Sequence, residues 1–185
     1  MKERSAARTK LVILDRDGTI NYDSDQYIKS PAEWRPLPGS LEAIARLTQA
    51  GWRCVVATNQ SGIARGLFDM ATLNAIHAEL HRAVTQAGGR IDAIFFCPHD
   101  AEADCQCRKP RPGLLREIAA RMDVDLAGVP MVGDALRDLQ AAAAAGCKPH
   151  LVLTGKGKQT RDAGGLPPGT EVFADLAAVA ARLAP

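Results

Sequence analysis

Short apolar runs alternate with longer amphipathic stretches along the chain. The apolar runs have the length of buried strands, and apolar positions in the longer stretches recur at helical spacing. The expected strands are Leu11–Leu14, Cys54–Ala57, Ile94–Phe96, Met131–Val132, Leu151–Leu153 and Val172–Ala174. The expected helices are Ser40–Gln49, Asp69–Ala87, Pro112–Met122, Ala135–Ala145 and Leu176–Leu183. This alternation predicts right-handed crossover connections and a mainly parallel sheet with helices on both faces.

Two segments depart from the alternation, and both are expected to be loops. Asn21–Pro38 is polar and carries aromatic residues, and Gly155–Thr170 is rich in Gly, Pro and charge. Loops of this length in a compact domain are usually functional or mobile. Because the chain shows no internal repeat, we expect one domain over residues 1–185, with residues 1–10 as a flexible basic tail. The predicted class is α/β, a Rossmann-like three-layer sandwich with a mainly parallel central sheet.

Composition narrows the possible partners. With 185 residues, 46% of them hydrophobic and 24% charged, the chain is typical of a globular domain with a sizeable core. A net charge of +2 gives no basic face for nucleic acid. No apolar stretch approaches the roughly 18 residues of a membrane span. We therefore expect no nucleic-acid or membrane partner and, without an obvious interaction helix, a monomer.

The cysteines indicate the compartment. There are five, an odd number, and three of them lie between residues 97 and 107. This is a poor disulfide framework and favours metal-binding thiolates in a reducing environment. The basic segment Met1–Lys10 is not followed by an apolar core, so it does not resemble a secretory signal. We expect a cytoplasmic protein.

The first expected strand runs directly into Asp15-Arg16-Asp17-Gly18-Thr19. Ligands of open parallel sheets bind beyond the carboxyl ends of the strands. Two carboxylates held there repel each other unless a cation or a shared proton intervenes. A Mg²⁺ ion, which takes oxygen ligands, would resolve that conflict. The alternative is an ordinary acidic turn, for which Asp-Gly is common chemistry.

Two later segments offer groups suited to an anion. Thr58-Asn59-Gln60-Ser61-Gly62 follows the second expected strand, with Arg65 just beyond it, and supplies a hydroxyl, an amide and a glycine turn. Arg108 and Lys109 lie directly before an expected helix, whose N-terminus favours phosphate. Taken alone, the first segment is also consistent with a polar strand-to-helix loop, and the second with a solvated basic turn.

A further acidic pair follows the fourth expected strand. Gly133-Asp134 places Asp134 at that strand's carboxyl end, close to the first acidic pair in a parallel sheet. Asp138 lies one helical turn later. It could orient a ligand, or it could simply cap backbone N–H groups at the start of the helix.

Four metal-binding side chains lie close together before Arg108. Cys97, His99, Cys105 and Cys107 form a Cys₃His set, which is a common closed zinc site. Because such a site leaves no open position, the zinc is expected to be structural and to fold the loop over residues 97–107. The alternative is a cysteine-bearing loop without metal.

Taken in order, these motifs resemble the haloacid dehalogenase superfamily of phosphotransferases, from about Leu11 to Leu153. The resemblance implies that Asp15 is the nucleophile that forms an aspartyl-phosphate, and that Asp17 is the general acid and base. It implies Mg²⁺ held by Asp15, the main-chain carbonyl of Asp17, and Asp134. It also implies that Thr58 and Lys109 stabilise the transferring phosphoryl group.

The zinc loop makes the resemblance more specific. Cys-x-His…Cys-x-Cys-Arg-Lys-Pro, with Thr-Asn-Gln-Ser-Gly-Ile-Ala-Arg-Gly upstream, looks like the D-glycero-D-manno-heptose 1,7-bisphosphate 7-phosphatases of ADP-heptose and lipopolysaccharide core synthesis. The histidinol-phosphate phosphatases of histidine biosynthesis are close relatives and remain an alternative. The expected substrate contacts are Asp23, Ser24, Asp25, Gln26, Asn59, Gln60, Ser61, Arg65 and Arg108. Ala135 stands where close relatives often carry Lys, which removes one potential substrate contact.

Larger members of the superfamily carry an inserted cap domain. Here the interval from Asp17 to Thr58 is already filled by a loop, a helix and a strand, so no large cap domain is expected and the site should be open. An alternative of another class is a non-catalytic, zinc-containing binding module in which the acidic pair only caps a turn. That alternative predicts no phosphate release with Mg²⁺.

Overall fold

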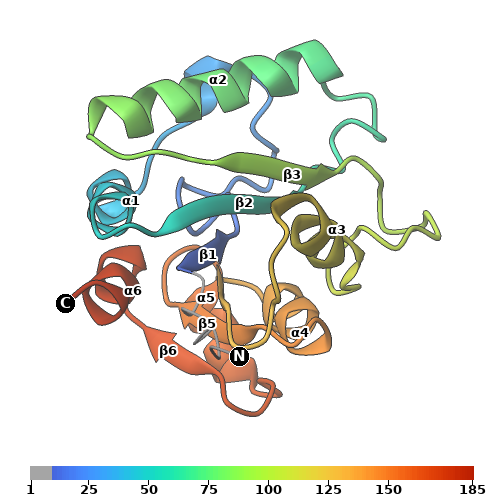
Figure 1. The fold of residues 1–185 in the computed structure, drawn as a ribbon. Helices are drawn as coiled ribbons and strands as arrows, with labels where there is room; N and C mark the ends of the chain where they lie inside the picture. Colours follow the sequence, from blue (N-terminus) through green and yellow to red (C-terminus); the bar gives the residue numbers. More distant parts are fainter. Residues whose placement is uncertain (1–9) are drawn as a thin grey trace.

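The computed structural model describes residues 10–185 and places six parallel strands in one sheet, in the order β3-β2-β1-β4-β5-β6 (Figure 1). The strands are β1 (Leu11–Leu14), β2 (Arg53–Asn59), β3 (Ala93–Cys97), β4 (Pro130–Gly133), β5 (Lys148–Val152) and β6 (Glu171–Phe173). The chain builds outward from β1 to β3 and then returns to place β4 against the other side of β1. The strand order therefore reverses between β1 and β4, where ligands of such sheets bind.

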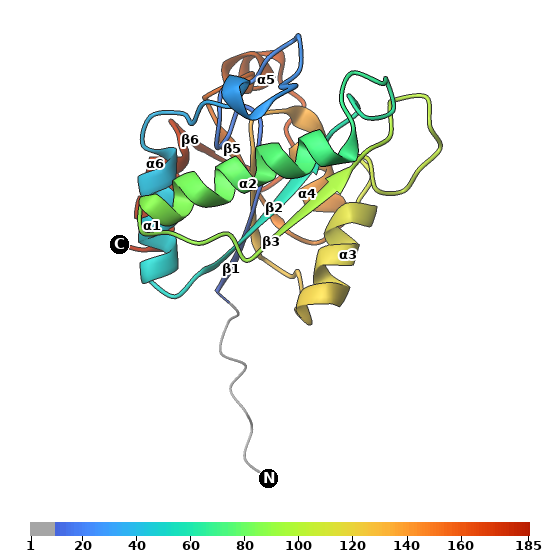
Figure 2. The same cartoon turned by 90° about the horizontal axis from the view of Figure 1, so that it is seen from above.

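Helices cover both faces of the sheet, as the alternating pattern predicted. They are α1 (Ser40–Gln49), α2 (Met70–Gln86), α3 (Gly113–Met122), α4 (Leu136–Ala144), α5 (Gly157–Ala163) and α6 (Leu176–Leu183), with a 3₁₀ turn at Pro31–Glu33. α1, α2 and α6 lie on one face and α3 and α4 on the other, and α2 runs across β2 and β3 (Figure 2).

Strand β1 shows how the core is divided between the two faces. All four of its residues are fully buried. Val12 and Leu14 pack into the cluster that includes α1, α2 and α6, and Leu11 and Ile13 pack against α3 and α4. A strand buried on both faces has a continuous apolar sequence rather than an alternating one, which explains why the run before Asp15 contains no polar residue.

The predicted α/β three-layer class is confirmed, and the chain between Asp17 and Thr58 forms a loop, α1 and β2 with no inserted cap. The predicted loop over 155–170 was wrong in part, because residues 157–163 form α5. This helix has few apolar positions and is held by tertiary contacts instead. Thr160 Oγ1 donates to the Asp134 carbonyl at 2.7 Å, and Gly157 packs closely against the Val152 carbonyl.

Two further expectations concern the N-terminal tail and membrane-spanning helices. The predicted flexible tail, apart from Lys10, lies outside the described residues. Across residues 10–185, none of the helices combines the length and the apolarity that a bilayer crossing requires.

Candidate active site

The carboxyl ends of β1 and β4 bring three buried carboxylates together. Asp15 follows β1, Asp134 follows β4, and the Asp15 backbone N–H donates to the Val132 carbonyl at 2.8 Å. Asp138 lies in the first turn of α4. One carboxylate oxygen of each of the three residues lies within 4.8 Å of those of the others, and none of the residues is more than 3% exposed. The prediction that Asp134 meets the first acidic pair is confirmed for Asp15, whereas Asp17 lies outside this cluster.

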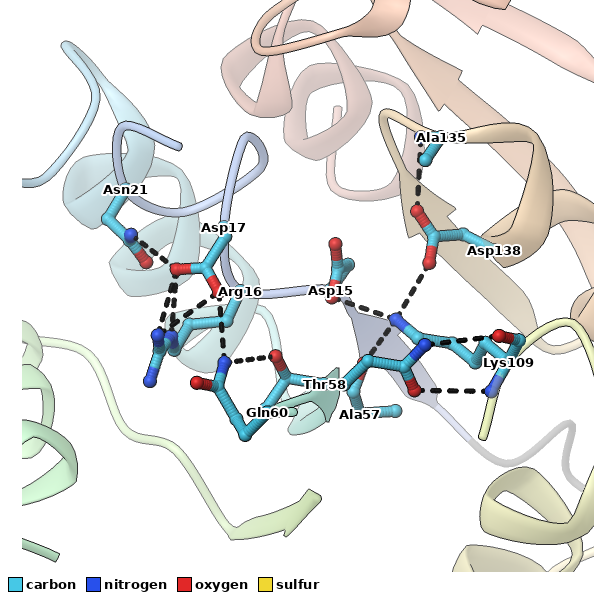
Figure 3. A network of polar contacts seen from close by, with 11 residues as sticks. Asp15, Arg16, Asp17, Asn21, Ala57, Thr58, Gln60, Lys109, Ala135 and Asp138 are labelled. Atoms are coloured by element: carbon cyan, nitrogen blue, oxygen red, sulfur yellow. Dashed lines mark hydrogen bonds and ion pairs between the residues drawn. The ribbon is translucent and has the colours of Figure 1, made fainter. Parts of the chain in front are cut away.

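A single buried ammonium group lies against two of these carboxylates (Figure 3). Lys109 is 1% exposed, and its Nζ lies 2.8 Å from Asp15 Oδ1 and 2.7 Å from Asp138 Oδ1. It also donates to the Ala57 carbonyl at 2.7 Å. Two hydrogen bonds and an ion pair with Asp138 therefore hold the ammonium group beside Asp15.

Asn59 and Asp138 hold Lys109 and the start of α4 in place. The Asn59 side chain accepts from the Lys109 backbone N–H and donates to the Lys109 carbonyl, both at 3.1 Å. Asp138 pairs with Lys109 through one oxygen and accepts from the Ala135 backbone N–H at 3.1 Å through the other. The capping role considered for Asp138 from the sequence is thus confirmed, and the same side chain also pairs with Lys109. Its role in orienting a ligand stays a prediction.

The charges of this cluster do not balance. Burial, followed by the neighbouring carboxylates, raises the pKa of Asp134 to about 8. Burial and Asp138 also raise the pKa of Asp15 to about 6, against the opposing effect of Lys109. Three carboxylates facing one ammonium group leave two negative charges in excess when all are ionised. A divalent cation with oxygen ligands compensates that excess, so the donor set fits Mg²⁺.

Asp17 lies apart from this cluster and is held by neutral and cationic donors. Arg16 Nε donates to Oδ1 at 3.0 Å, Asn21 Nδ2 to the same oxygen at 2.9 Å, and Gln60 Nε2 to Oδ2 at 2.9 Å. Burial alone would raise the pKa of Asp17, but Arg16 and these hydrogen bonds outweigh it and lower the pKa below its usual range. The carboxylate is consequently ionised in this arrangement.

The buried side chain of Thr58 contributes a hydroxyl group to the site. It is 1% exposed, and its Oγ1 accepts from Gln60 Nε2 at 2.9 Å. Since the oxygen serves as acceptor for Gln60, its own hydrogen is free to be donated to a ligand. Gln60 thus links Thr58 to Asp17, in addition to lining the pocket.

These groups line a polar pocket of about 230 Å³. The lining residues are Asp15, Asp17, Asp23, Ser24, Asp25, Tyr27, Ile28, Thr58, Asn59, Gln60, Ser61, Arg108, Lys109, Arg137 and Lys156. Two predicted substrate contacts, Gln26 and Arg65, are not among them. The turn closed by the Tyr27 N–H and the Ser24 carbonyl puts Gln26 in a neighbouring hollow, and Arg65 is exposed in the turn after β2.

The predicted zinc ligands also converge. Cys97, His99, Cys105 and Cys107 place one ligand atom each within 4.8 Å of the others. Cys97 Sγ lies 3.8 Å from Cys105 Sγ and 3.5 Å from His99 Nδ1. Tetrahedral zinc with its usual bond lengths separates two sulfurs by about 3.8 Å and a sulfur from a nitrogen by about 3.5 Å. Cys107 Sγ lies closer than these values, 3.2 Å from Cys97 Sγ and 3.3 Å from His99 Nδ1. The four ligand atoms therefore have the chemistry of a zinc site and come close to its spacing.

Comparisons with known proteins agree with this geometry. Residues 106–179 match the HAD-hydrolase-like family model. The chain is 68% identical over 174 residues to the D-glycero-beta-D-manno-heptose-1,7-bisphosphate 7-phosphatase of Bordetella bronchiseptica, covering 94% of this chain and 97% of the relative. It is 57% identical to the enzyme of the same name from Pseudomonas aeruginosa, over 94% and 97% of the two chains. The chain belongs to this phosphatase family.

A solved member of the family supports the magnesium site. The crystal structure of D,D-heptose 1,7-bisphosphate phosphatase from B. bronchiseptica, complexed with magnesium and phosphate, has a TM-score of 0.93 and 67% identity, and the match covers 95% of this chain and 98% of that one. A second structure, from Burkholderia thailandensis, is 58% identical with a TM-score of 0.76 and covers 94% and 97%.

The loop after β5 contributes a pocket residue of this family member that the sequence pattern did not predict. Lys156 lines the pocket, and its Nζ lies 3.2 Å from an Asp23 carboxylate oxygen and 3.3 Å from one of Asp25. Its backbone N–H donates to Asp134 Oδ2 at 2.7 Å. The available signal was the Gly-Lys pair just beyond a strand. Gly155 has φ +53°, and a Cβ there would lie 2.2 Å from Asp134 Oδ2.

Arg137 is another unpredicted pocket residue, as are Tyr27 and Ile28. It lies two residues after Ala135, at the start of α4. Its guanidinium group brings a further positive charge to the wall of a pocket whose floor is acidic. This side of the pocket therefore has a cation although position 135 is Ala.

Proposed function

We propose that this protein removes the C7 phosphate from D-glycero-D-manno-heptose 1,7-bisphosphate. The observation that carries the proposal is the placement of Asp15 beside Lys109 and within reach of Asp134, at the point where the strand order reverses. The names of the relatives at 68% and 57% identity support the choice of substrate. The floor of the pocket supplies a nucleophile, and its rim supplies Arg108, Arg137 and Lys156 for a second anionic group.

In the proposed reaction, Asp15 attacks phosphorus. A bond forms between its carboxylate oxygen and phosphorus, and the bond from phosphorus to the C7 oxygen breaks. Asp17 gives the proton that the leaving oxygen requires, which first needs Asp17 to be protonated as substrate binds. It then takes a proton from the water that attacks the aspartyl-phosphate, and the bond to Asp15 breaks. Lys109 and Thr58 stabilise the charge of the transferring group.

Asp15, Asp134 and the main-chain carbonyl of Asp17 are the groups proposed to hold Mg²⁺. When bound, the ion supplies positive charge that lets an anionic carboxylate approach an anionic phosphate. The zinc site is proposed to be structural. It holds the loop before Lys109, where Arg108 Nη1 donates to the His99 carbonyl at 3.1 Å. We further propose a cytoplasmic monomer, and the five free cysteines are consistent with a reducing compartment.

A comparison of substrates tests this function. Phosphate release should require Mg²⁺, and kcat/KM should be higher for the heptose bisphosphate than for histidinol phosphate. A higher kcat/KM for histidinol phosphate would overturn the proposed substrate but leave the proposed aspartyl-phosphate mechanism in place. No release from either substrate, with Asp15→Asn indistinguishable from wild type in all assays, would favour the binding-module alternative.

A further inference from the structure

Arg16 is the most deeply buried cation besides Lys109 among the described residues. Its side chain is 1% exposed, although it lies between two acidic residues in the loop that follows β1. Guanidinium groups are almost never fully buried unless they are paired. The partner of this one is its own neighbour, Asp17, rather than Asp15 or any group of the metal cluster (Figure 3).

The pairing is a two-point contact. Arg16 Nε lies 3.0 Å from Asp17 Oδ1, and Nη2 lies 3.1 Å from Oδ2 and 2.9 Å from Oδ1. A planar guanidinium that donates to both oxygens fixes the plane of the carboxylate as well as its position. Asn21 and Gln60 add one donor each, but neither contacts both oxygens.

The third nitrogen of the guanidinium group, Nη1, contacts a histidine of α2. Arg16 Nη1 lies 3.3 Å from His77 Nε2, across 61 residues of sequence. His77 is 7% exposed and lies among the apolar residues of α2 that face the sheet. Burial and Arg16 lower the pKa of His77 to about 3, so its ring is neutral and Nε2 can accept from Nη1. A polar ring on the apolar face of this helix thus has a specific partner.

We infer that Arg16 is a positioning residue, held by His77, that fixes the orientation of the Asp17 carboxylate for its proton transfers. The inference rests on the role proposed above for Asp17. A carboxylate on a loop rotates freely about two bonds, and a proton transfer requires it within hydrogen-bond reach of the reacting oxygen. Neither Arg16 nor His77 lines the pocket, so both act through Asp17 rather than on the substrate.

The dependence of kcat/KM on the leaving group distinguishes a role in positioning Asp17 from a general structural effect. A sugar alkoxide needs a proton to leave, whereas p-nitrophenolate does not, and kcat/KM reports the step in which the leaving group departs. His77→Leu should lower kcat/KM for the heptose bisphosphate by roughly 10- to 100-fold. It should change kcat/KM for p-nitrophenyl phosphate by less than about twofold. His77→Gln, which keeps an acceptor, should recover most of the loss.

A control and a double variant make the test decisive. His81→Leu removes an exposed histidine one turn further along α2 and should change neither value. In an Asp17→Asn background, His77→Leu should cause no further loss, because residues that act as one unit are not additive. Equal losses on the two substrates, or a full further loss in the double variant, would overturn the inference.

The role of Arg16 is checked with Arg16→Lys and with an NMR signal. The lysine keeps the charge but not the two-point contact, so it should show the same substrate-selective loss. The Arg16 Nε–H signal should be protected from solvent exchange in wild type and in His77→Gln, and lose that protection in His77→Leu.

If the wild type hydrolyses other alkyl phosphates but not the heptose bisphosphate, the proposed substrate is wrong. The same comparison is then made with the alkyl phosphate, and equal losses on it and on p-nitrophenyl phosphate would overturn the inference.

Discussion

The unbalanced charge beneath the pocket predicts that the metal-free protein loses stability as pH rises, and that Mg²⁺ restores it. Both Asp15 and Asp134 have a pKa of about 4 in an unfolded chain. In the folded protein the values are about 6 and about 8. A carboxyl with a raised folded pKa holds its proton more tightly when folded. Its contribution to stability is therefore present at low pH and is lost as pH rises towards the folded pKa.

The size of the effect follows from these values. Each pH unit between the unfolded and folded pKa lowers the free energy of unfolding by about 1.4 kcal/mol per group. From pH 5 to pH 8, Asp134 loses about 4 kcal/mol and Asp15 about 1 kcal/mol. For a domain of this size, 1 kcal/mol corresponds to about 2–4 °C in Tm. The site alone should thus lower the metal-free Tm by roughly 10–20 °C over this interval.

Thermal melts at pH 5 and pH 8, with and without millimolar Mg²⁺, measure this effect. No chelator is used, because a chelator would also remove zinc. The rise in Tm caused by Mg²⁺ should be small at pH 5 and large at pH 8. Asp134→Asn removes the group with the higher pKa, so this variant should melt above wild type at pH 8 without metal and should respond little to Mg²⁺.

Asp162→Asn, a change at an exposed position in α5, is the matched control and should behave as wild type. The buried, neutral histidines His77 and His150 gain stability as pH rises, but they contribute equally to wild type and variant and cancel in the comparison. An equal response to Mg²⁺ at both pH values would refute the reasoning. So would an Asp134→Asn protein no more stable than wild type at pH 8.

Three further substitutions test other parts of the site. Asp15→Asn should lower kcat by at least about a thousandfold. It should leave Tm unchanged or higher, because it removes a carboxylate that Asp138 repels, while Lys109 keeps Asp138 as its ionic partner; near-normal kcat would contradict the assignment of Asp15 as nucleophile. Cys107→Ser should lower the zinc content and reduce Tm by roughly 5 °C or more, whereas Cys147→Ala, in the core outside the cluster, should keep its zinc; absence of zinc from wild type would contradict this. Gly155→Ala should lower kcat because its Cβ would press on Asp134, whereas Gly51→Ala, with φ +82° and nothing within 4 Å, should lower stability only; equal kcat in the two variants would show that the close approach is unimportant.

The meeting of Asp15 and Asp134 was predictable because parallel strands end at the same edge of a sheet, and short apolar runs locate those ends. The zinc cluster was predictable because its ligands lie within eleven consecutive positions, residues 97–107. In both cases the signal is local in the sequence. The roles of the individual site residues stay predictions until the variants above are measured.

The remaining features depend on contacts that no local pattern encodes. His77 looks like an ordinary core position of an amphipathic helix until the rotation of α2 places its ring against Arg16. Asn59 resembles a ligand-binding amide, yet its side chain clasps the backbone of Lys109, fifty residues away. Helix α5 lacks an apolar stripe and forms because Thr160 anchors it to the end of β4.

The three acceptors around the Lys109 ammonium group come from distant parts of the chain. Asp15 is 94 residues away, Ala57 is 52 residues away, and Asp138 belongs to α4. No fragment shorter than residues 15–138 contains the complete arrangement, so it can exist only after segments far apart in the sequence have docked against one another. Enzymatic turnover during refolding should therefore lag behind secondary structure and report the last step of folding, and partly folded chains should be inert rather than indiscriminate hydrolases.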